Sequence, residues 1–554
     1  MKSSKIIYYL RYSKFIGRVV YSEKTMITLK QYFIRLFLLI NIISCAKKEE
    51  FKRPNILICI ADDQSFPHAG AYGADWVKTP NFDRIANSGL LFMNAYTCNA
   101  KCAPSRSAIL TGRNSWQLEE AASHVGYFPN KFKTVFEALK TAGYSTGRTA
   151  KGWAPGVIEK TNGQPRELIG INYSSLKTTP PTNKISNIDY ARNFELFLNN
   201  TSDEPFAFWY GGIEPHRAYE FQSGVKKGNK KLADIDKVPD YWMDNETIRN
   251  DMLDYAFEIE YFDQHLGSIL KVLEEKGMLE NTLIIVTSDN GMPFPRSKAQ
   301  EYPFSTHMPL AIMWADGINK PGRTISDYVS NIDFAATFLE AAGIEEQISG
   351  MQPITGKSLF PIFKSEKEGR VEDNRDYVLV GKERHDTGRP NDVGYPIRGI
   401  ISDEFVYFKN FKPDRWPTGR PETGYLDCDG SPTKTQILDA YRTENHHLWE
   451  LSFGRRTAEE FYDLKSDPYC MKNMAADARF EEQKNHWSKL LIQNLIEQED
   501  PRVLEKGDVF DNYPIMPKQI RFYERFLKGE IMDHVWVNET DFRPEQNEAL
   551  LSAN

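Results

Sequence analysis

The sequence predicts an α/β protein in which a doubly wound sheet is flanked by helices and followed by a smaller α+β region with an antiparallel sheet. The first observation behind this prediction is that short apolar strands alternate with amphipathic helices from residue 54 to about residue 365. The second is a charged linker at residues 364–376, beyond which the segments are typical of antiparallel strands. We therefore expect a larger domain at residues 54–365 and a smaller one at residues 366–500.

The larger domain is expected to begin with a buried parallel strand at residues 55–62, because NILICIAD is a continuous apolar run that ends in carboxylates. Apolar residues at helical spacing predict a helix at residues 132–144, with Gly143 as its C-terminal cap. A longer helix is predicted from about residue 246 to residue 277, where Gly277 ends it. Further strands are expected at residues 205–212, 282–289 and 309–314.

The smaller domain contains two segments, DYVLVG and IRGIISDEFVYFKNF, that predict antiparallel strands. A helix is expected near residues 480–498. Residues 501–554 are expected to form a polar, aromatic tail.

Residues 1–44 have the pattern of a secretory signal peptide, and residues 1–25 are a candidate mis-assigned start. The apolar run Leu36–Ile43 follows a basic segment and is far shorter than the roughly 20 residues that span a bilayer. IISC resembles a bacterial lipobox, so we expect lipidation of Cys45, a tether at residues 45–53, and an anchor in a bacterial outer membrane or periplasm. The alternatives are a buried helix and an ordinary signal with a coincidental cysteine.

Composition and charge exclude several classes of protein. The 554 residues are 41% hydrophobic and 26% charged, values that exclude a disordered or collagenous chain. The formal charge is −7, but residues 1–44 carry eight Lys or Arg and one Glu, so the remainder carries −14. This acidic balance predicts no nucleic-acid partner, and no membrane contact except through the lipid anchor.

The chain has six cysteines and no CxxC motif, so a zinc ribbon and a thioredoxin-type site are excluded. In an oxidising compartment, four of the cysteines could form one or two disulfides, whose pairing the sequence leaves open. These four are Cys59, Cys98, Cys428 and Cys470.

Oxygen-bearing side chains follow two of the predicted strands. Asp62 and Asp63 end the first strand, and Asp289 and Asn290 end the strand TLIIVTSD. Ligands of open α/β sheets bind at the carboxyl ends of strands, and such an oxygen set suits Ca²⁺ or Mg²⁺ better than zinc. Taken separately, the two pairs could equally be turn and cap residues.

The segment CAPSRSAILTGR, residues 102–113, has the pattern C-x-P-S-R-x4-T-G. With the preceding DD and the following SDNG, it resembles the formylglycine-dependent (type I) sulfatases of the alkaline-phosphatase superfamily. The resemblance extends from about residue 54 to the low 500s and implies an alkaline-phosphatase-like fold. TLIIVTSDNGMPFP, EPHR and GYPIRGI are most similar to the N-sulfoglucosamine sulfohydrolase (heparan N-sulfatase)-like group of bacterial polysaccharide sulfatases.

The resemblance implies that Cys102 is oxidised to formylglycine by a maturation enzyme. The aldehyde hydrate has two hydroxyls on one carbon: one attacks sulfur, and the second expels sulfate and restores the aldehyde. The hydrate oxygen would bind the metal together with the carboxylates and amide named above. Arg106, one helical turn beyond Cys102, would hold the hydrate and the metal-site carboxylates.

Three further positions match the active-site pattern of the family. Lys151 in GRTAKGW follows a strand, His216 lies in EPHR, and Lys298 follows the SDNG turn. The resemblance implies that they converge on the sulfate oxygens, and that His216 or Lys298 protonates the leaving alcohol. Taken singly, each could equally be a structural or solvated residue.

The chain departs from the family at Trp153, where many members have a histidine that acts as a base. Because indole cannot accept a proton, His124, His307 and His385 are the candidates to replace it. We hypothesise that Trp153 lines a sugar subsite.

Residues 381–386 and 411–434 are expected to contribute to substrate selection through His385, Arg415 and Trp416. These residue types bind sulfates, carboxylates and sugar faces. The alternative for each is a packed loop. His307 is a further candidate substrate residue.

The sequence therefore predicts a hydrolase of sulfate esters, or N-sulfates, on a sulfated polysaccharide or oligosaccharide, with Ca²⁺ (or Mg²⁺) and formylglycine. A phosphonate or phosphodiester hydrolase of the same superfamily is the alternative enzyme. A surface polysaccharide-binding protein without catalysis is the alternative outside enzymes.

Overall fold

The computed structural model describes residues 52–201, 204–443 and 446–530. Contacts divide the chain into Met1–Lys52 and Arg53–Asn554, and the fold below is that of the second unit. The expected signal peptide, Cys45 and the last part of the expected tail lie outside the described residues. Among the residues that are described, no helix is long and apolar enough to cross a bilayer.

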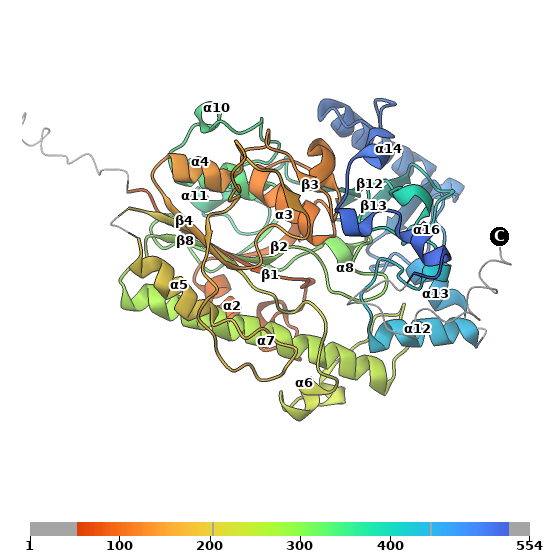
Figure 1. Cartoon of the computed structure of the whole chain (residues 1–554), viewed down its shortest axis with the longest axis horizontal. Coiled ribbons are helices and arrows are strands. Elements are labelled where there is room, and N and C mark those ends of the chain that lie inside the picture. The colour runs from red at the N-terminus through yellow and green to blue at the C-terminus, as the bar shows by residue number, and fades with distance from the viewer. Residues whose placement is uncertain (1–51, 202–203, 444–445, 531–554) are drawn as a thin grey trace, which may run out of the picture. The chain divides into compact units, whose positions relative to one another are not determined.

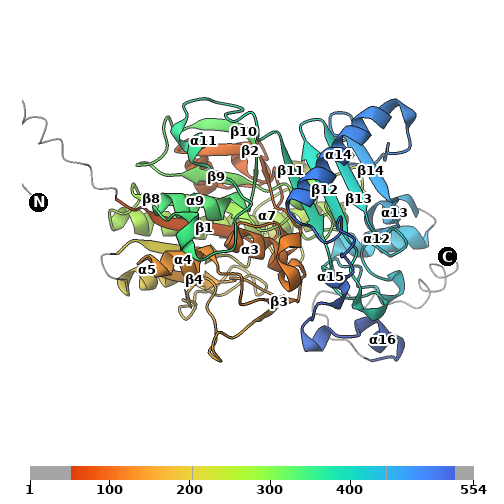
Figure 2. The ribbon, with the colours of Figure 1, turned by 90° about the horizontal axis from the view of Figure 1, so that it is seen from above.

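An eight-stranded sheet organises the larger part of this unit (Figures 1 and 2). Its strands are β1 (Asn55–Ala61), β2 (Leu90–Tyr96), β4 (Ser145–Ala150), β6 (Ile171–Asn172), β7 (Phe206–Gly211), β8 (Thr282–Ser288), β9 (Leu310–Met313) and β10 (Arg323–Ser330). Their order in space is β10-β2-β9-β8-β1-β7-β4-β6. Neighbours are parallel except where β9 pairs antiparallel with β2 and β8. All seven residues of β1 are buried, as expected of an inner strand covered on both faces.

Helices cover both faces of this sheet, and alternate residues of β1 contact the two layers. The helices are α2 (Pro80–Asn87), α3 (Cys102–Thr111), α4 (Val135–Thr141), α5 (Tyr190–Asn199), α7 (Glu246–Glu275), α9 (Asp333–Ala341) and α11 (Phe360–Lys364). Ile56 and Ile58 belong to a core with α3, α4, α9 and α11, whereas Leu57 and Cys59 belong to a core with α2, α5 and α7. Figure 1 shows α2, α5 and α7 together on one side of the sheet.

A second, four-stranded sheet follows the charged linker. It consists of β11 (Tyr377–Lys382), β12 (Ile397–Ser402), β13 (Phe405–Asn410) and β14 (Glu459–Asp463), paired antiparallel in that order. One face packs under α14 (Glu481–Glu497) through Leu491 and Leu495 (Figure 2). The other face packs against Tyr96, Tyr302 and Tyr328 of the larger part. Because of this contact, the loops of the second sheet lie next to the first sheet.

Short elements complete the unit. They are β3 (Tyr127–Phe128), β5 (Val157–Ile158), α6 (Ser223–Lys226), α8 (Pro303–Thr306), α10 (Glu346–Ser349), α12 (Pro432–Arg442), α13 (His446–Phe453), α15 (Val509–Asn512) and α16 (Phe522–Leu527). The last two lie in the expected tail, where Phe510 and Phe522 are buried.

The predicted fold class is confirmed, and each predicted strand and long helix is present near its expected bounds. The helix expected at residues 132–144 is shorter because a capping box starts it: Thr134 Oγ1 accepts from Glu137 N–H, and the Glu137 carboxylate accepts from Thr134 N–H. Gly143 follows it with φ +90°, as a C-terminal cap requires. The strands β2 and β10 were not predicted.

The disulfide expectation is wrong for the described cysteines. They are all buried and free: Cys59, Cys98, Cys102, Cys428 and Cys470. Cys102 lies in the site described below. The other four lie in four separate hydrophobic clusters, where they pack as small apolar side chains and do not pair with one another.

Candidate active site

The carboxyl ends of β1 and β8 meet the N-terminus of α3. Asp62 and Asp63 follow β1, which is paired in parallel with β8. Asp289 and Asn290 follow β8. Cys102 is the first residue of α3, and its Sγ lies 3.5 Å from Asp62 Oδ1 and 3.9 Å from Asp63 Oδ1. All five side chains are at most 1% exposed, so the structure brings together the residues expected to bind metal.

The donor set at this point fits a hard divalent cation. Asp62, Cys102 and Asp289 offer ligand atoms that lie within 4.8 Å of one another. Asn290 Oδ1 is buried and accepts no hydrogen bond, which leaves it available to a cation. Asp63 adopts φ +78°, in the left-handed region, and its N–H donates to Asp289 Oδ1. Three carboxylates and one amide oxygen are ligands that Ca²⁺ and Mg²⁺ accept.

Arg106 connects α3 to the strand ends. It lies one turn after Cys102 on the same helical face, and it is fully buried. Its Nε donates to Asp289 Oδ2 at 2.8 Å, and its Nη1 donates to the carbonyls of Lys151 and Gly152. Its Nη2 is buried, 3.6 Å from Asp62 Oδ1 and without a hydrogen bond, so this N–H group can serve an incoming anion.

Two lysines pair with two of the carboxylates. Lys151 Nζ is 2.5 Å from Asp62 Oδ2, and Lys298 Nζ is 2.6 Å from Asp63 Oδ2. Burial alone would raise the pKa of Asp62, but Lys151, His216 and Arg106 together lower it. Burial opposes the charge of each lysine, yet the neighbouring carboxylates raise the pKa of both. The lysines therefore remain cationic.

His216 lies beside Lys298. Its Nδ1–H donates to the Arg217 carbonyl at 2.7 Å, which leaves Nε2 as the atom that faces Lys298 Nζ at 3.2 Å. Nε2 also lies 3.8 Å from Asp63 Oδ2. We call the assembled set the inner site: Asp62, Asp63, Cys102, Arg106, Lys151, His216, Asp289, Asn290 and Lys298.

The structure adds four residues that the sequence did not identify, Lys101, Asp386, Asp427 and Asp429, and places the candidate base His124 beside them. Lys298 Nζ forms a 3.0 Å ion pair with Asp429 Oδ2. Lys101 Nζ lies 2.8 Å from Asp386 Oδ2 and 2.8 Å from Asp427 Oδ1. His124 Nδ1 lies 2.9 Å from Asp386 Oδ1. We call this second set the outer wall: Lys101, His124, Asp386, Asp427 and Asp429.

The signal for these carboxylates was present in the sequence, because residues 381–386 and 411–434 were already expected to select substrate. Only basic and aromatic residues were chosen there, since they bind anions and sugars. Acidic side chains do not suggest a site for an anion, so Asp386, Asp427 and Asp429 were passed over.

The structure contradicts the sugar-stacking hypothesis for Trp153. The indole is 7% exposed, its Nε1–H donates to Ser107 Oγ at 2.7 Å, and its ring lies edge-on to Phe128. It belongs to the hydrophobic core on the α3 side of the sheet. An indole held in this way offers no open face to a sugar.

Three more substrate candidates also have structural roles. His307 stacks between Phe66 and Tyr96 and is hydrogen bonded to the Met93 carbonyl. Arg415 forms an ion pair with Asp511. Trp416 is buried in a separate hydrophobic cluster.

His385 lies behind the outer wall, where its Nε2 is 2.6 Å from Asn99 Oδ1. It is 2% exposed. Of the three histidines considered in place of the base, His124 belongs to the outer wall, where its partly exposed side chain contacts Asp386.

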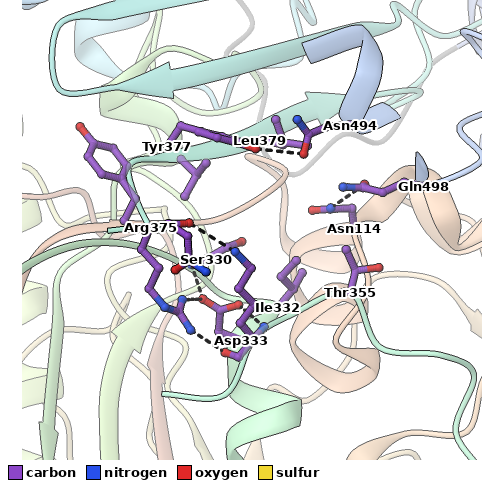
Figure 3. Close-up of a pocket in the computed structure, with 14 residues that line it drawn as sticks. Asn114, Ser330, Ile332, Asp333, Thr355, Arg375, Tyr377, Leu379, Asn494 and Gln498 are labelled. Atoms are coloured by element: carbon purple, nitrogen blue, oxygen red, sulfur yellow. Dashed lines mark hydrogen bonds and ion pairs between the residues drawn. The ribbon is translucent and has the colours of Figure 1, made fainter. Parts of the chain in front are cut away.

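A separate cavity of about 120 Å³ lies where the two sheets meet (Figure 3). Ser330 and Asp333 line one side of it, and Tyr377, Leu379 and Asn494 line the other. No inner-site or outer-wall residue lines this cavity. It belongs to the contact between the sheets.

Comparison with known proteins agrees with this geometry. The human N-sulphoglucosamine sulphohydrolase is 27% identical over 463 residues, covering 77% of this chain and 86% of that protein. The N-acetylglucosamine-6-O-sulfatase of Bacteroides thetaiotaomicron is 27% identical over 570 residues, covering 85% and 92%. A structure solved in complex with its substrate D-glucosamine-2-N,6-O-disulfate has a TM-score of 0.58 at 21% identity, covers 81% of this chain and 99% of its own, and supports the fold alone. Because residues 54–344, more than half of the sequence, also match the sulfatase family, the chain belongs to the sulfatase family.

Proposed function

We propose that this protein hydrolyses sulfate esters on the sugars of a sulfated polysaccharide or oligosaccharide. The observation that carries the proposal is the convergence of Cys102, four oxygen donors and four basic side chains at one sheet end. The two relatives named above act, by their names, on sulfated glucosamine derivatives, and they support a sugar as the carrier of the sulfate.

Two groups beyond the unmodified chain complete this chemistry. Asp62, Asp63, Asp289 and Asn290 would hold a divalent cation, which we propose to be Ca²⁺ and which supplies positive charge next to a sulfate oxygen. Formylglycine at position 102 supplies a hydrated aldehyde as the nucleophile.

The basic residues of the inner site bind and orient the sulfate group. Arg106 Nη2 and the Lys151 and Lys298 ammonium groups offer N–H donors to three sulfate oxygens from different directions. Lys298 Nζ or His216 Nε2, 3.2 Å apart, holds the proton for the oxygen that leaves with the sugar. Burial of the carboxylates excludes bulk water, which strengthens each of these interactions.

The test is an assay of protein produced together with a formylglycine-generating enzyme. Mass spectrometry of the peptide that contains residue 102 first establishes the aldehyde. Sulfate release is then measured from 4-nitrophenyl sulfate and from sulfated hexoses and hexosamines, with phenyl phosphonate as the competing substrate. We expect sulfate release to exceed phosphonate hydrolysis, and the reverse order would overturn the proposal in favour of a phosphonate hydrolase.

The same assay distinguishes O-sulfate from N-sulfate and identifies the metal. Glucosamine 6-sulfate and N-sulfoglucosamine, supplied separately, report which bond is cleaved, and we propose the O-sulfate ester. Chelation should abolish turnover, and Ca²⁺ should restore more activity than Mg²⁺. Full activity after chelation would argue against the metal site.

We also propose that the chain is exported and lipid-anchored through Cys45, on the strength of the sequence pattern alone. In the bacterial host, the protein should fractionate with membranes, and Cys45→Ala should move it to the soluble fraction. An unchanged distribution would contradict the anchor.

A further inference from the structure

Side-chain exposure locates the approach to the inner site. Arg106 and Asp289 have fully buried side chains, whereas those of Lys151 and His216 are 16% and 14% exposed. In the outer wall, the side chain of His124 is 12% exposed. These partly exposed side chains mark the side from which a sulfate group would reach Cys102. The outer wall contacts the inner site through the Lys298–Asp429 ion pair, so the group that carries the sulfate would lie near it.

The outer wall is rich in hydrogen-bond acceptors. Its three carboxylates are Asp386 and Asp427, which share the Lys101 ammonium, and Asp429, which pairs with Lys298 of the inner site. Burial would raise the pKa of Asp386, but His124 and Lys101 hold it well below its usual range, so this carboxylate is ionised. Burial lowers the pKa of His124 despite its contact with Asp386.

One acceptor of the outer wall accepts no hydrogen bond from the described residues. Asp427 is 2% exposed, and its Oδ2 has no hydrogen-bond donor, with His385 Nδ1 3.8 Å away. An ionised carboxylate can only accept hydrogen bonds. Hydroxyl and ammonium groups can donate to these oxygens, whereas a carboxylate or sulfate group on the ligand cannot.

The arginines next to the outer wall in sequence donate their hydrogen bonds to backbone carbonyls rather than to its carboxylates, although Arg389 is close enough to Asp427 for an electrostatic attraction. Arg384 donates to the carbonyls of Asp392 and Tyr513. Arg389 donates to the carbonyls of Trp416 and Pro417. Arginine is the residue that binds carboxylate and sulfate oxygens in pairs, and both guanidinium groups are committed to the backbone.

We propose that the outer wall recognises the sugar that carries the scissile sulfate, and that it selects a monosulfated sugar with hydroxyl or amino neighbours over a uronate or a disulfated sugar. This inference rests on the proposed function, because it assigns the part of the ligand next to the cleaved sulfate. A second anionic group would lie against Asp386 and Asp427, and like charges placed together in this way are costly.

The experiment compares kcat/KM for glucosamine 6-sulfate, galactose 6-sulfate, glucosamine 2-N,6-O-disulfate and an unsaturated uronate 2-sulfate, on enzyme with formylglycine at residue 102. The first two should exceed the last two by at least about tenfold. Asp386→Asn should reduce this preference by about tenfold, mainly through KM, because an amide can donate to an anion. The ratio of sugar-sulfate to 4-nitrophenyl sulfate turnover should fall in the same variant.

Two further variants keep the test interpretable. His124→Gln should change the same preference if Asp386→Asn does not fold. Glu260→Gln is the matched control. Glu260 lies on α7, and its partly buried carboxylate pairs with Lys230 rather than with an inner-site or outer-wall residue. It should leave the preference unchanged.

The possible outcomes separate the two proposals. Turnover of 4-nitrophenyl sulfate with a preference for the uronate or the disulfated sugar overturns this inference and leaves the sulfatase function standing. No turnover of any sulfate by aldehyde-bearing enzyme overturns the proposed function, and this inference with it. An equal loss on sugar and aryl sulfates in Asp386→Asn also overturns it.

Discussion

The inner site and the outer wall lie side by side, but the chain builds them differently. Most inner-site residues follow strands of one sheet, and the pairing of β1 with β7 and β8 fixes their positions. The outer wall takes Lys101 and His124 from the larger part and its three carboxylates from loops around the second sheet. The proposed chemistry therefore rests on the strand ends of one sheet, whereas the proposed selection of the sugar rests on loops.

The largest expected effect tests whether the inner site carries all of the chemistry. Cys102→Ala removes the precursor of the nucleophile, so turnover of every sulfate substrate should fall by at least about 10⁴-fold. Sulfate release by ion chromatography measures this loss. Cys470→Ala, which removes another buried free thiol, is the control and should stay active. Retained activity in Cys102→Ala would place the chemistry elsewhere.

Arg106→Lys should give the next largest effect. The guanidinium bridges Asp289 and two backbone carbonyls and still offers Nη2, a set of contacts that a single ammonium cannot reproduce. We expect kcat to fall by about 10² to 10³. The loss should be equal for aryl and sugar sulfates, since Arg106 belongs to the inner site. If Arg106→Lys lowered turnover of sugar sulfates alone, Arg106 would act on the sugar, and the proposed division of roles between the inner site and the outer wall would be wrong.

Trp153→Ala should act on stability more than on catalysis. Removal of a buried indole leaves a cavity and removes the hydrogen bond that Ser107 Oγ accepts, at a cost of about 3 to 5 kcal/mol in the free energy of unfolding. KM for sugar sulfates should change little in the fraction that remains folded. Thermal denaturation and active-site titration measure the two effects. A raised KM with unchanged stability would revive the sugar-stacking hypothesis.

The same contrast explains what the sequence could predict. Inner-site residues lie in short motifs at strand ends. The apolar pattern of the strands therefore predicted that these residues lie near one another, and the family resemblance implied their roles. Asp427 and Asp429 also lie close together, but their meeting with Lys101 and Lys298 depends on how the two sheets pack. Trp153 was misjudged because its sequence position next to Lys151 does not reveal that its side chain turns into the core.

A smaller effect is expected at Glu301, which lies near both regions. Glu301 follows Lys298 by three residues, and its Oε1 is 3.9 Å from His385 Nε2. Both carboxyl oxygens are buried and accept no hydrogen bond from another side chain. Burial raises its pKa from 4.5 to about 8, although Lys382 and Arg398 oppose the shift. The carboxyl group is therefore protonated in the folded protein at neutral pH.

Between pH 4.5 and pH 8 the folded chain holds a proton at Glu301 that the unfolded chain releases, so stability falls as the pH rises through this window. Glu301→Gln removes the titration, because the amide is neutral throughout. The variant should gain a few kcal/mol over the unmodified protein between pH 5 and pH 8. Urea unfolding at a series of pH values measures the difference. Parallel stability profiles would mean that Glu301 is ionised in the folded state. The region around Glu301 and His385 would then carry one more negative charge than we propose.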